Sequence, residues 1–70
     1  MTDIYIIASW YPGEGTPDIE VCMETIDLAG AAFEAGEAGK TIRIIHVFEM
    51  DDGTVRSADV TKTWKKKHES

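Results

Sequence analysis

Cysteine, long apolar runs and basic residues are all scarce in this chain of 70 residues, and each scarcity narrows what the protein can be. The single cysteine, Cys22, has no partner for an internal disulfide, so a reducing compartment is expected. No segment approaches the ~20 consecutive apolar residues of a membrane-spanning helix. The start of the chain is acidic and is followed by a short apolar stretch at 4–7, whereas a secretory signal has a basic start and a longer apolar stretch. The sequence therefore predicts a cytoplasmic protein with no membrane partner.

The chain is long enough for one domain. At this size only roughly 60% of the surface of the unfolded chain is buried on folding, so a lone core is marginally stable. Small domains are usually stabilised further by disulfides, a metal or oligomerisation. Because the chain has one cysteine, we expect its additional stability to come from tight packing or self-association.

Charge is unevenly distributed along the chain. Residues 1–61 contain three basic residues against twelve acids, a net charge of −9, and residues 62–70 carry +3. Tyr5, Trp10 and Tyr11 are of the type that stacks on bases, but binding sites for nucleic acid set such aromatics in positive surroundings. The acidic body therefore argues against nucleic acid and favours a protein partner with a basic surface.

Apolar periodicity divides the chain into four strands and one helix. The strands are rich in β-branched and aromatic residues or alternate apolar with polar ones. Asp52-Gly53 precedes the last strand and is typical of a short hairpin turn, because such turns require positive φ. The strands are predicted at 4–10, 19–24, 41–50 and 54–63.

The helix is predicted over residues 26–38. Thr25 is its expected N-cap, Asp27 favours the positive end of the helix dipole, and Gly39 suits the position after the helix end. The core side of this helix is mostly Ala and Gly, with Phe33 as its one large anchor.

The element order β-β-α-β-β predicts an α+β fold, an antiparallel sheet of about four strands with one helix on one face. A single domain is expected at residues 1–64, followed by a basic, disordered tail at 65–70. Residues 19–24 also fit helix spacing through Ile19, Met23 and Ile26. A helix starting there would give the order β-α-β-β, and this alternative stays open.

One helix covers only one face of a sheet, yet the strands at 4–10 and 41–50 are apolar on both faces. An uncovered apolar face is either an interface or a liability. We therefore expect a homodimer or a protein partner at this face. The residues predicted to remain uncovered are Tyr5, Ile7, Tyr11, Ile45 and Val47.

Residues suited to catalysis are few and isolated. Cys22 could serve as a nucleophile with His46 as its base, but structural roles for both are preferred. Asp51-Asp52-Gly53 lacks the further alternating acids of a calcium loop, and Glu14 between two glycines would repel phosphate. No catalytic residue, metal or cofactor is predicted. The acids Glu14, Asp18, Glu20 and Glu24 form either a solvated surface or one that docks in a basic groove and mimics nucleic-acid phosphates.

The layout of residues 3–64 resembles that of short phage-borne inhibitors of CRISPR effector complexes. It is also similar to short bacterial domains of unknown function with a hairpin–helix–hairpin plan. The resemblance rests on the element order, with Ile4–Ile7, Ile19–Val21, Thr25 to Ala38, Ile42–Phe48 and Asp52-Gly53 as the matching parts. It implies a non-enzymatic protein that binds a large bacterial ribonucleoprotein, and no binding residues carry over from it.

The first hypothesis is thus a small acidic interaction module or inhibitor, of phage or mobile-element origin. The alternative is a small dimeric enzyme or ligand-binding domain with a site at the dimer interface. Cys22, His46, Tyr5 and Trp10 would contribute to that site. A third hypothesis is a structural or regulatory domain that only dimerises.

Overall fold

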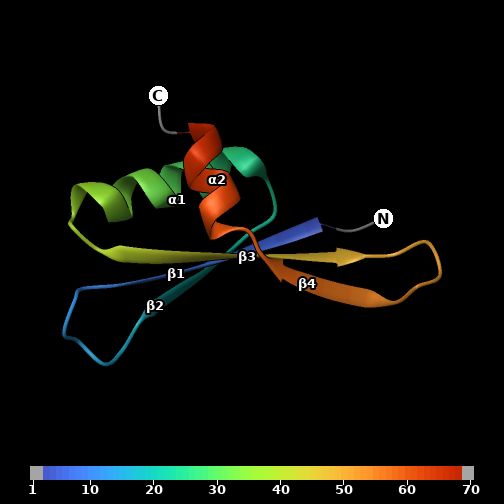
Figure 1. Cartoon of the computed structure of the whole chain (residues 1–70), viewed down its shortest axis with the longest axis horizontal. Coiled ribbons are helices and arrows are strands. Elements are labelled where there is room, and N and C mark those ends of the chain that lie inside the picture. Colours follow the sequence, from blue (N-terminus) through green and yellow to red (C-terminus); the bar gives the residue numbers. More distant parts are fainter. Residues whose placement is uncertain (1–2, 69–70) are drawn as a thin grey trace.

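The computed structural model describes residues 3–68 and has an α+β fold (Figure 1). Four strands form one antiparallel sheet in the order β2-β1-β3-β4. Both helices lie on the same side of this sheet. The elements are β1 Asp3–Trp10, β2 Asp18–Cys22, α1 Thr25–Glu37, β3 Thr41–Glu49, β4 Val55–Asp59 and α2 Thr61–His68. The predicted fold class and the order of its first five elements are confirmed.

Residues 18–22 are a strand, so the alternative order β-α-β-β is wrong. Antiparallel pairing with β1 sets their conformation, with Tyr5 opposite Cys22 and Ser9 opposite Asp18. Helix α1 begins directly afterwards at Thr25, and its N-cap position is Glu24 rather than the predicted Thr25. The side chain of Glu24 makes no capping hydrogen bond.

Helix α1 ends as predicted, at a glycine with positive φ. Gly39 has φ +77°, and the amides of Gly39 and Lys40 donate to the carbonyls of Gly36 and Ala35 at 3.1 and 2.9 Å. These two bonds form a Schellman motif, which satisfies carbonyls that the helix end would leave unpaired. The motif turns the chain directly into β3.

The core anchor of α1 is Leu28 and not Phe33. Leu28 is completely buried, and Ala32 and Ala35 follow it at helical spacing on the same stripe. Phe33 is 68% exposed on the opposite side of the helix. The prediction failed because so many of the helix residues are Ala or Gly that the apolar stripe could be drawn in more than one direction.

The C-terminal residues contain a second helix that the sequence analysis missed. The fourth strand ends at Asp59 instead of 63, and Thr61–His68 form α2. The Oδ1 of Asp59 accepts hydrogen bonds from the amide and the hydroxyl of Thr61 at 3.0 and 2.6 Å. This turn redirects the chain from strand to helix. Residues 65–68 of the predicted disordered tail are therefore helical, and 69–70 lie outside the described residues.

Thr61 also completes the sheet hydrogen bonds where β4 stops. The amide of Val60 donates to the carbonyl of Ile44 at 2.9 Å, and the amide of Ile44 donates to the buried Oγ1 of Thr61 at 2.8 Å. A threonine side chain thus takes the place of the next strand carbonyl. Without it, a buried backbone donor would have no partner.

The core lies between the sheet and the two helices. Val60 and Trp64 pack against it from the α2 side, and Tyr5 and Ala31 pack at its margin. The core contains few residues, as is expected for a chain of this size. The buried residues of the core are Ile7, Cys22, Leu28, Ala32, Ala35, Ile42 and Ile44.

Candidate functional site

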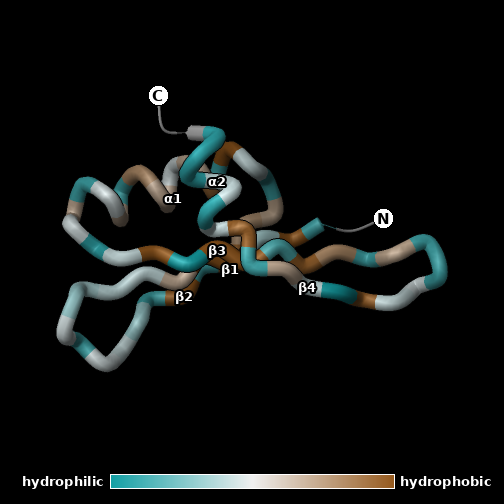
Figure 2. The backbone as a smooth tube through the Cα atoms, in the orientation of Figure 1, coloured by the Kyte–Doolittle hydropathy of each residue, from teal (hydrophilic) through white to brown (hydrophobic). Residues whose placement is uncertain are grey.

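The face of the sheet opposite the helices is largely apolar on β1, β2 and β3, and β4 adds Val55 to it. We call it the open face, since both helices of residues 3–68 lie on the other side (Figure 1). Figure 2 shows hydrophobic residues concentrated where β1, β2 and β3 cross beneath the helices. The residues of the open face are identified from strand alternation and pairing register. Its apolar residues are Ile4, Ile6, Ala8, Trp10, Ile19, Val21, Ile45, Val47 and Val55.

Register aligns these side chains into contiguous rows. Ile6 pairs with Val21 on one side and with Ile45 on the other, which places three β-branched residues across three strands. Ile4 pairs with Val47 in the next row. Such cross-strand neighbours lie about 4.5–5.5 Å apart, so the rows form one continuous patch.

Strand β2 is oriented against its own sequence pattern. Its apolar residues Ile19 and Val21 are on the open face, 59% and 61% exposed, while Asp18 and Glu20 are on the helix side. An alternating strand normally places its apolar side in the core. A shift of one residue in its pairing would exchange the two sides. Here only Cys22, at the end of the strand, enters the core.

The predicted uncovered residues divide between the two faces. Ile45 and Val47 are on the open face, as predicted. Tyr5 and Ile7 are on the helix side, where Ile7 is a core residue, so their predicted exposure on the open face is wrong. Tyr11 lies beyond the end of β1, with the Nζ of Lys40 5.1 Å from its ring centroid.

The error has a definite cause. Strand β1 is apolar on both sides, and the prediction placed the side of Ile4 and Ile6 against the helix. Register decides otherwise, because Ile7 pairs with Ile44 and both are buried beneath α1. The composition of the two sides does not reveal the choice. The side with Ile4 and Ile6 is entirely apolar, yet the side that includes Asp3 and Ser9 is the one that lies beneath the helices.

The residues of the predicted acidic group come from three different parts of the fold. Asp18 and Glu20 share the helix side of β2, Glu14 lies in the loop before β2, and Glu24 is at the start of α1. Asp18 is bound by Lys40, with Nζ and Oδ2 2.7 Å apart. This hydrogen bond raises the pKa of Lys40 above its ordinary value.

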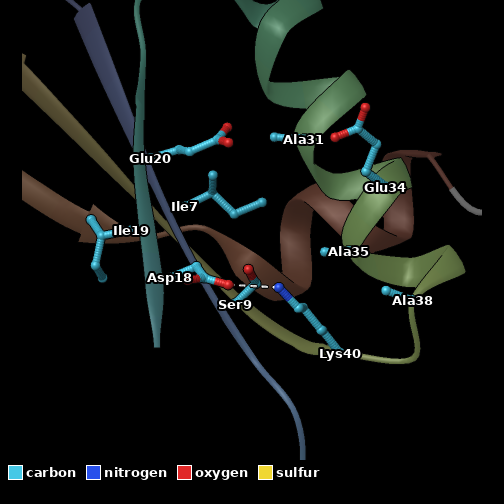
Figure 3. A pocket seen from close by; sticks show the side chains of 10 residues that line it. All are labelled: Ile7, Ser9, Asp18, Ile19, Glu20, Ala31, Glu34, Ala35, Ala38 and Lys40. Atoms are coloured by element: carbon cyan, nitrogen blue, oxygen red, sulfur yellow. Dashed lines mark hydrogen bonds and ion pairs between the residues drawn. The ribbon is translucent and has the colours of Figure 1, made fainter. Parts of the chain in front are cut away.

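A pocket of about 350 Å³ between β2 and α1 adds an acid that the sequence analysis missed (Figure 3). Glu20 from β2 and Glu34 from α1 extend from opposite walls of this pocket, and Ile7 lies between the walls. Lys40 lies at one end, held by Asp18. We refer to Asp18, Glu20 and Glu34 as the acidic edge. Glu34 could be found only from the fold, since it is 14 residues further along the chain than Glu20.

His46 belongs to an aromatic cluster on the helix side of the sheet. Its ring stacks on Tyr5 with the centroids 4.6 Å apart, and Phe48 follows at 5.0 Å. Its Nε2 lies 2.9 Å from Oδ1 of Asp3. The cluster borders a hollow of about 370 Å³, and the residues lining that hollow include no hydroxyl or thiol nucleophile. The contacts with Tyr5, Phe48 and Asp3 orient the ring of His46.

The pairing of Cys22 with His46 is excluded by the sheet. Both residues pair with Tyr5, on opposite sides of β1, so they are two strand spacings or about 9.6 Å apart. Burial raises the pKa of the Cys22 thiol, and the nearby carboxylates of Glu20 and Asp27 raise it further. A buried thiol held in its protonated form is a poor nucleophile.

Two further findings concern the described residues alone. Residues 3–68 contain no group of three or more His, Cys, Asp or Glu side chains arranged to hold a metal ion. In the same part of the chain, neither helix has the length and apolar character needed to cross a membrane.

Comparison of the chain with protein-family models, with curated proteins and with solved structures found no match.

Proposed function

We propose that this chain is a non-enzymatic protein-interaction module whose main binding surface is the open face. The observation that carries the proposal is the orientation of β2, which directs Ile19 and Val21 away from the core. A strand whose apolar side is exposed gains from a partner that covers it, by about 25 cal/mol for each Å² of apolar surface removed from water. The exposed patch spans β1, β2 and β3, so a partner would cover a continuous surface rather than one side chain.

The acidic edge adds a second element to the proposal, a partner with a basic surface. Glu20 and Glu34 lie on the two walls of one pocket, and its one basic lining residue, Lys40, is already bound by Asp18. Basic side chains from a partner would therefore be attracted there. We extend the proposal to an inhibitor that occupies the nucleic-acid-binding surface of a bacterial nucleoprotein. The proposed compartment is the cytoplasm, since the one cysteine is a free thiol.

The position of the candidate catalytic groups supports this proposal over a dimeric enzyme. A site at an interface formed by the open face would include Trp10 but not Tyr5 or His46, which are on the helix side. Cys22 is buried in the core. The four residues of the enzyme hypothesis would therefore be separated by the sheet itself.

The test is affinity capture from bacterial lysate with three versions of the protein as bait. The first is the wild type, and the second carries Ile19→Lys and Val21→Lys on the open face. The third is a control with Ile26→Lys and Phe33→Lys on α1, where the exposed fractions of 74% and 68% are similar. We expect proteins captured by the wild type and the control to be lost with the open-face variant. Capture of the same proteins by all three would contradict the proposal.

A fourth bait tests the basic partner. It carries Glu20→Lys and Glu34→Lys and keeps Asp18, because Asp18 binds Lys40. A partner recognised through the acidic edge should be lost with this bait and released from the wild type by salt. Retention of every captured protein by the fourth bait would exclude this part of the proposal.

A further inference from the structure

We propose that the occupant of the open face is a second copy of this chain, packed sheet against sheet with the helices outside. This inference rests on the proposed function, since it names the partner of the same surface. The arrangement would be a four-layer sandwich with the apolar sides of both sheets in the middle. Three observations support a second copy over a basic protein at this face, namely charge, area and the small core.

The charge of the open face suits a copy of itself. Its strand residues include one basic side chain, Arg43, and two acidic ones, Asp59 and Glu49. Arg43 and Asp59 form an ion pair within the chain, with Nη1 and Oδ2 3.1 Å apart. The net charge of −6 therefore resides mainly on other surfaces. A nearly neutral face gives a basic partner little to recognise, whereas two such faces can meet without strong local repulsion.

The area of the open face is slightly below the lower limit for a specific dimer, before protruding side chains are counted. Strands of 8, 5, 9 and 5 residues present about 430 Å² of flat sheet, at about 3.3 Å per residue and about 4.8 Å between strands. Two copies would therefore bury roughly 900 Å² in total, without the additional surface of the protruding side chains. Specific interfaces begin near 1,000 Å² in total, so we expect a reversible dimer rather than a permanent one.

The one-sided core gives the chain a reason to pair. Its seven buried residues lie on the helix side of the sheet. A dimer would bury the rows of Ile6, Val21 and Ile45 in a second core shared by both copies. Because a two-fold dimer uses the same patch on both copies, one apolar face is sufficient. The acidic edge would remain outside and would be displayed twice, so a partner with two basic sites could bind both.

The first measurement is the molar mass of the purified wild type by light scattering and sedimentation, from about 1 µM to about 1 mM. We expect the mass to rise from 7.7 kDa toward twice that value with concentration. Added salt should strengthen the dimer, since it screens the repulsion between two acidic chains. A complex held by a basic surface would instead weaken in salt.

The second measurement uses matched variants. Ile19→Lys with Val21→Lys places two charges on the open face, and Ile26→Lys with Phe33→Lys places two on the outer side of α1. Both pairs change the net charge equally and affect exposed positions. We expect the open-face variant to remain folded by circular dichroism and monomeric at about 1 mM, with at least a tenfold weaker association. The α1 variant should dimerise like the wild type.

Two results would overturn the inference. One is a wild type that keeps the mass of a single chain at about 1 mM. The other is a dimer that survives the open-face variant while the α1 variant dissociates, which would place the interface on the helix side. If the wild type is monomeric but lysate capture still depends on Ile19 and Val21, the second copy is excluded and the proposed function stands. If neither measurement responds to these residues, both fail.

Discussion

Replacement of Thr61 tests how the chain changes from strand to helix. In Thr61→Val the shape of the side chain is kept, but the buried amide of Ile44 loses the Oγ1 acceptor at 2.8 Å. Leaving a buried donor unsatisfied costs about 1–3 kcal/mol. For a domain of this size, a loss of about 2 kcal/mol lowers Tm by about 8–16 °C. Thr61→Ser is the matched control, because it keeps the oxygen and removes one methyl group, which costs about 0.8 kcal/mol.

The assay is thermal and urea unfolding followed by circular dichroism. All three proteins are compared at one concentration, because self-association would itself raise Tm. We expect the order of stability to be wild type, then Thr61→Ser, then Thr61→Val. If Thr61→Val equals or exceeds Thr61→Ser in stability, the hydroxyl does not complete the sheet, and the account of the β4–α2 junction is wrong.

Three further predictions concern backbone, pH and thiol chemistry. Gly39→Ala should lower the free energy of unfolding by about 1–2 kcal/mol, because φ is +77° there. Gly30→Ala within α1 should raise the free energy of unfolding by about 0.5–1 kcal/mol. Urea unfolding of both variants shows whether the two changes in stability have opposite signs. Hydrogen bonds from Thr61 lower the pKa of Asp59 in the folded state, so the stability they give is present above the unfolded pKa of about 3.9 and is lost as the pH falls through the folded value. Asp59→Asn should therefore be less stable than the wild type at neutral pH, with a difference that shrinks below about pH 4, and a constant difference would contradict this. Cys22 is 4% exposed, so a thiol reagent at neutral pH should modify it at least about tenfold more slowly than in urea, and equal rates would show that the thiol is accessible.

Local chemistry was sufficient to predict most of the elements. The hairpin turn at Asp52-Gly53 was predicted because few residues tolerate positive φ, and Gly53 does have φ +86°. The same reasoning placed the end of α1 at Gly39. Helix α2 was missed because residues 62–67, with four lysines and no long apolar stripe, are typical of a solvated segment. Its start coincides with the turn in which Asp59 accepts the amide and hydroxyl hydrogen bonds of Thr61.

The sequence could predict that an apolar face stays uncovered but could not predict all the residues on that face. The sequence indicated an uncovered apolar face and included Ile45 and Val47 in it. It could not decide which side of β1 was uncovered, because both sides are apolar and their assignment depends on register with β3. The meeting of Glu20 and Glu34 across one pocket likewise required the packing of α1 against the sheet.

The sequence by itself determined the strands, the main helix, the turns and the acidic character of this protein. These features depend on period, on glycine conformation and on charge, which act over a few residues or through composition alone. Only the tertiary structure decided which apolar residues are buried beneath the helices and which form the open face. The physical reason is that the pairing of distant strands sets the register, and a shift of one residue exchanges the two faces.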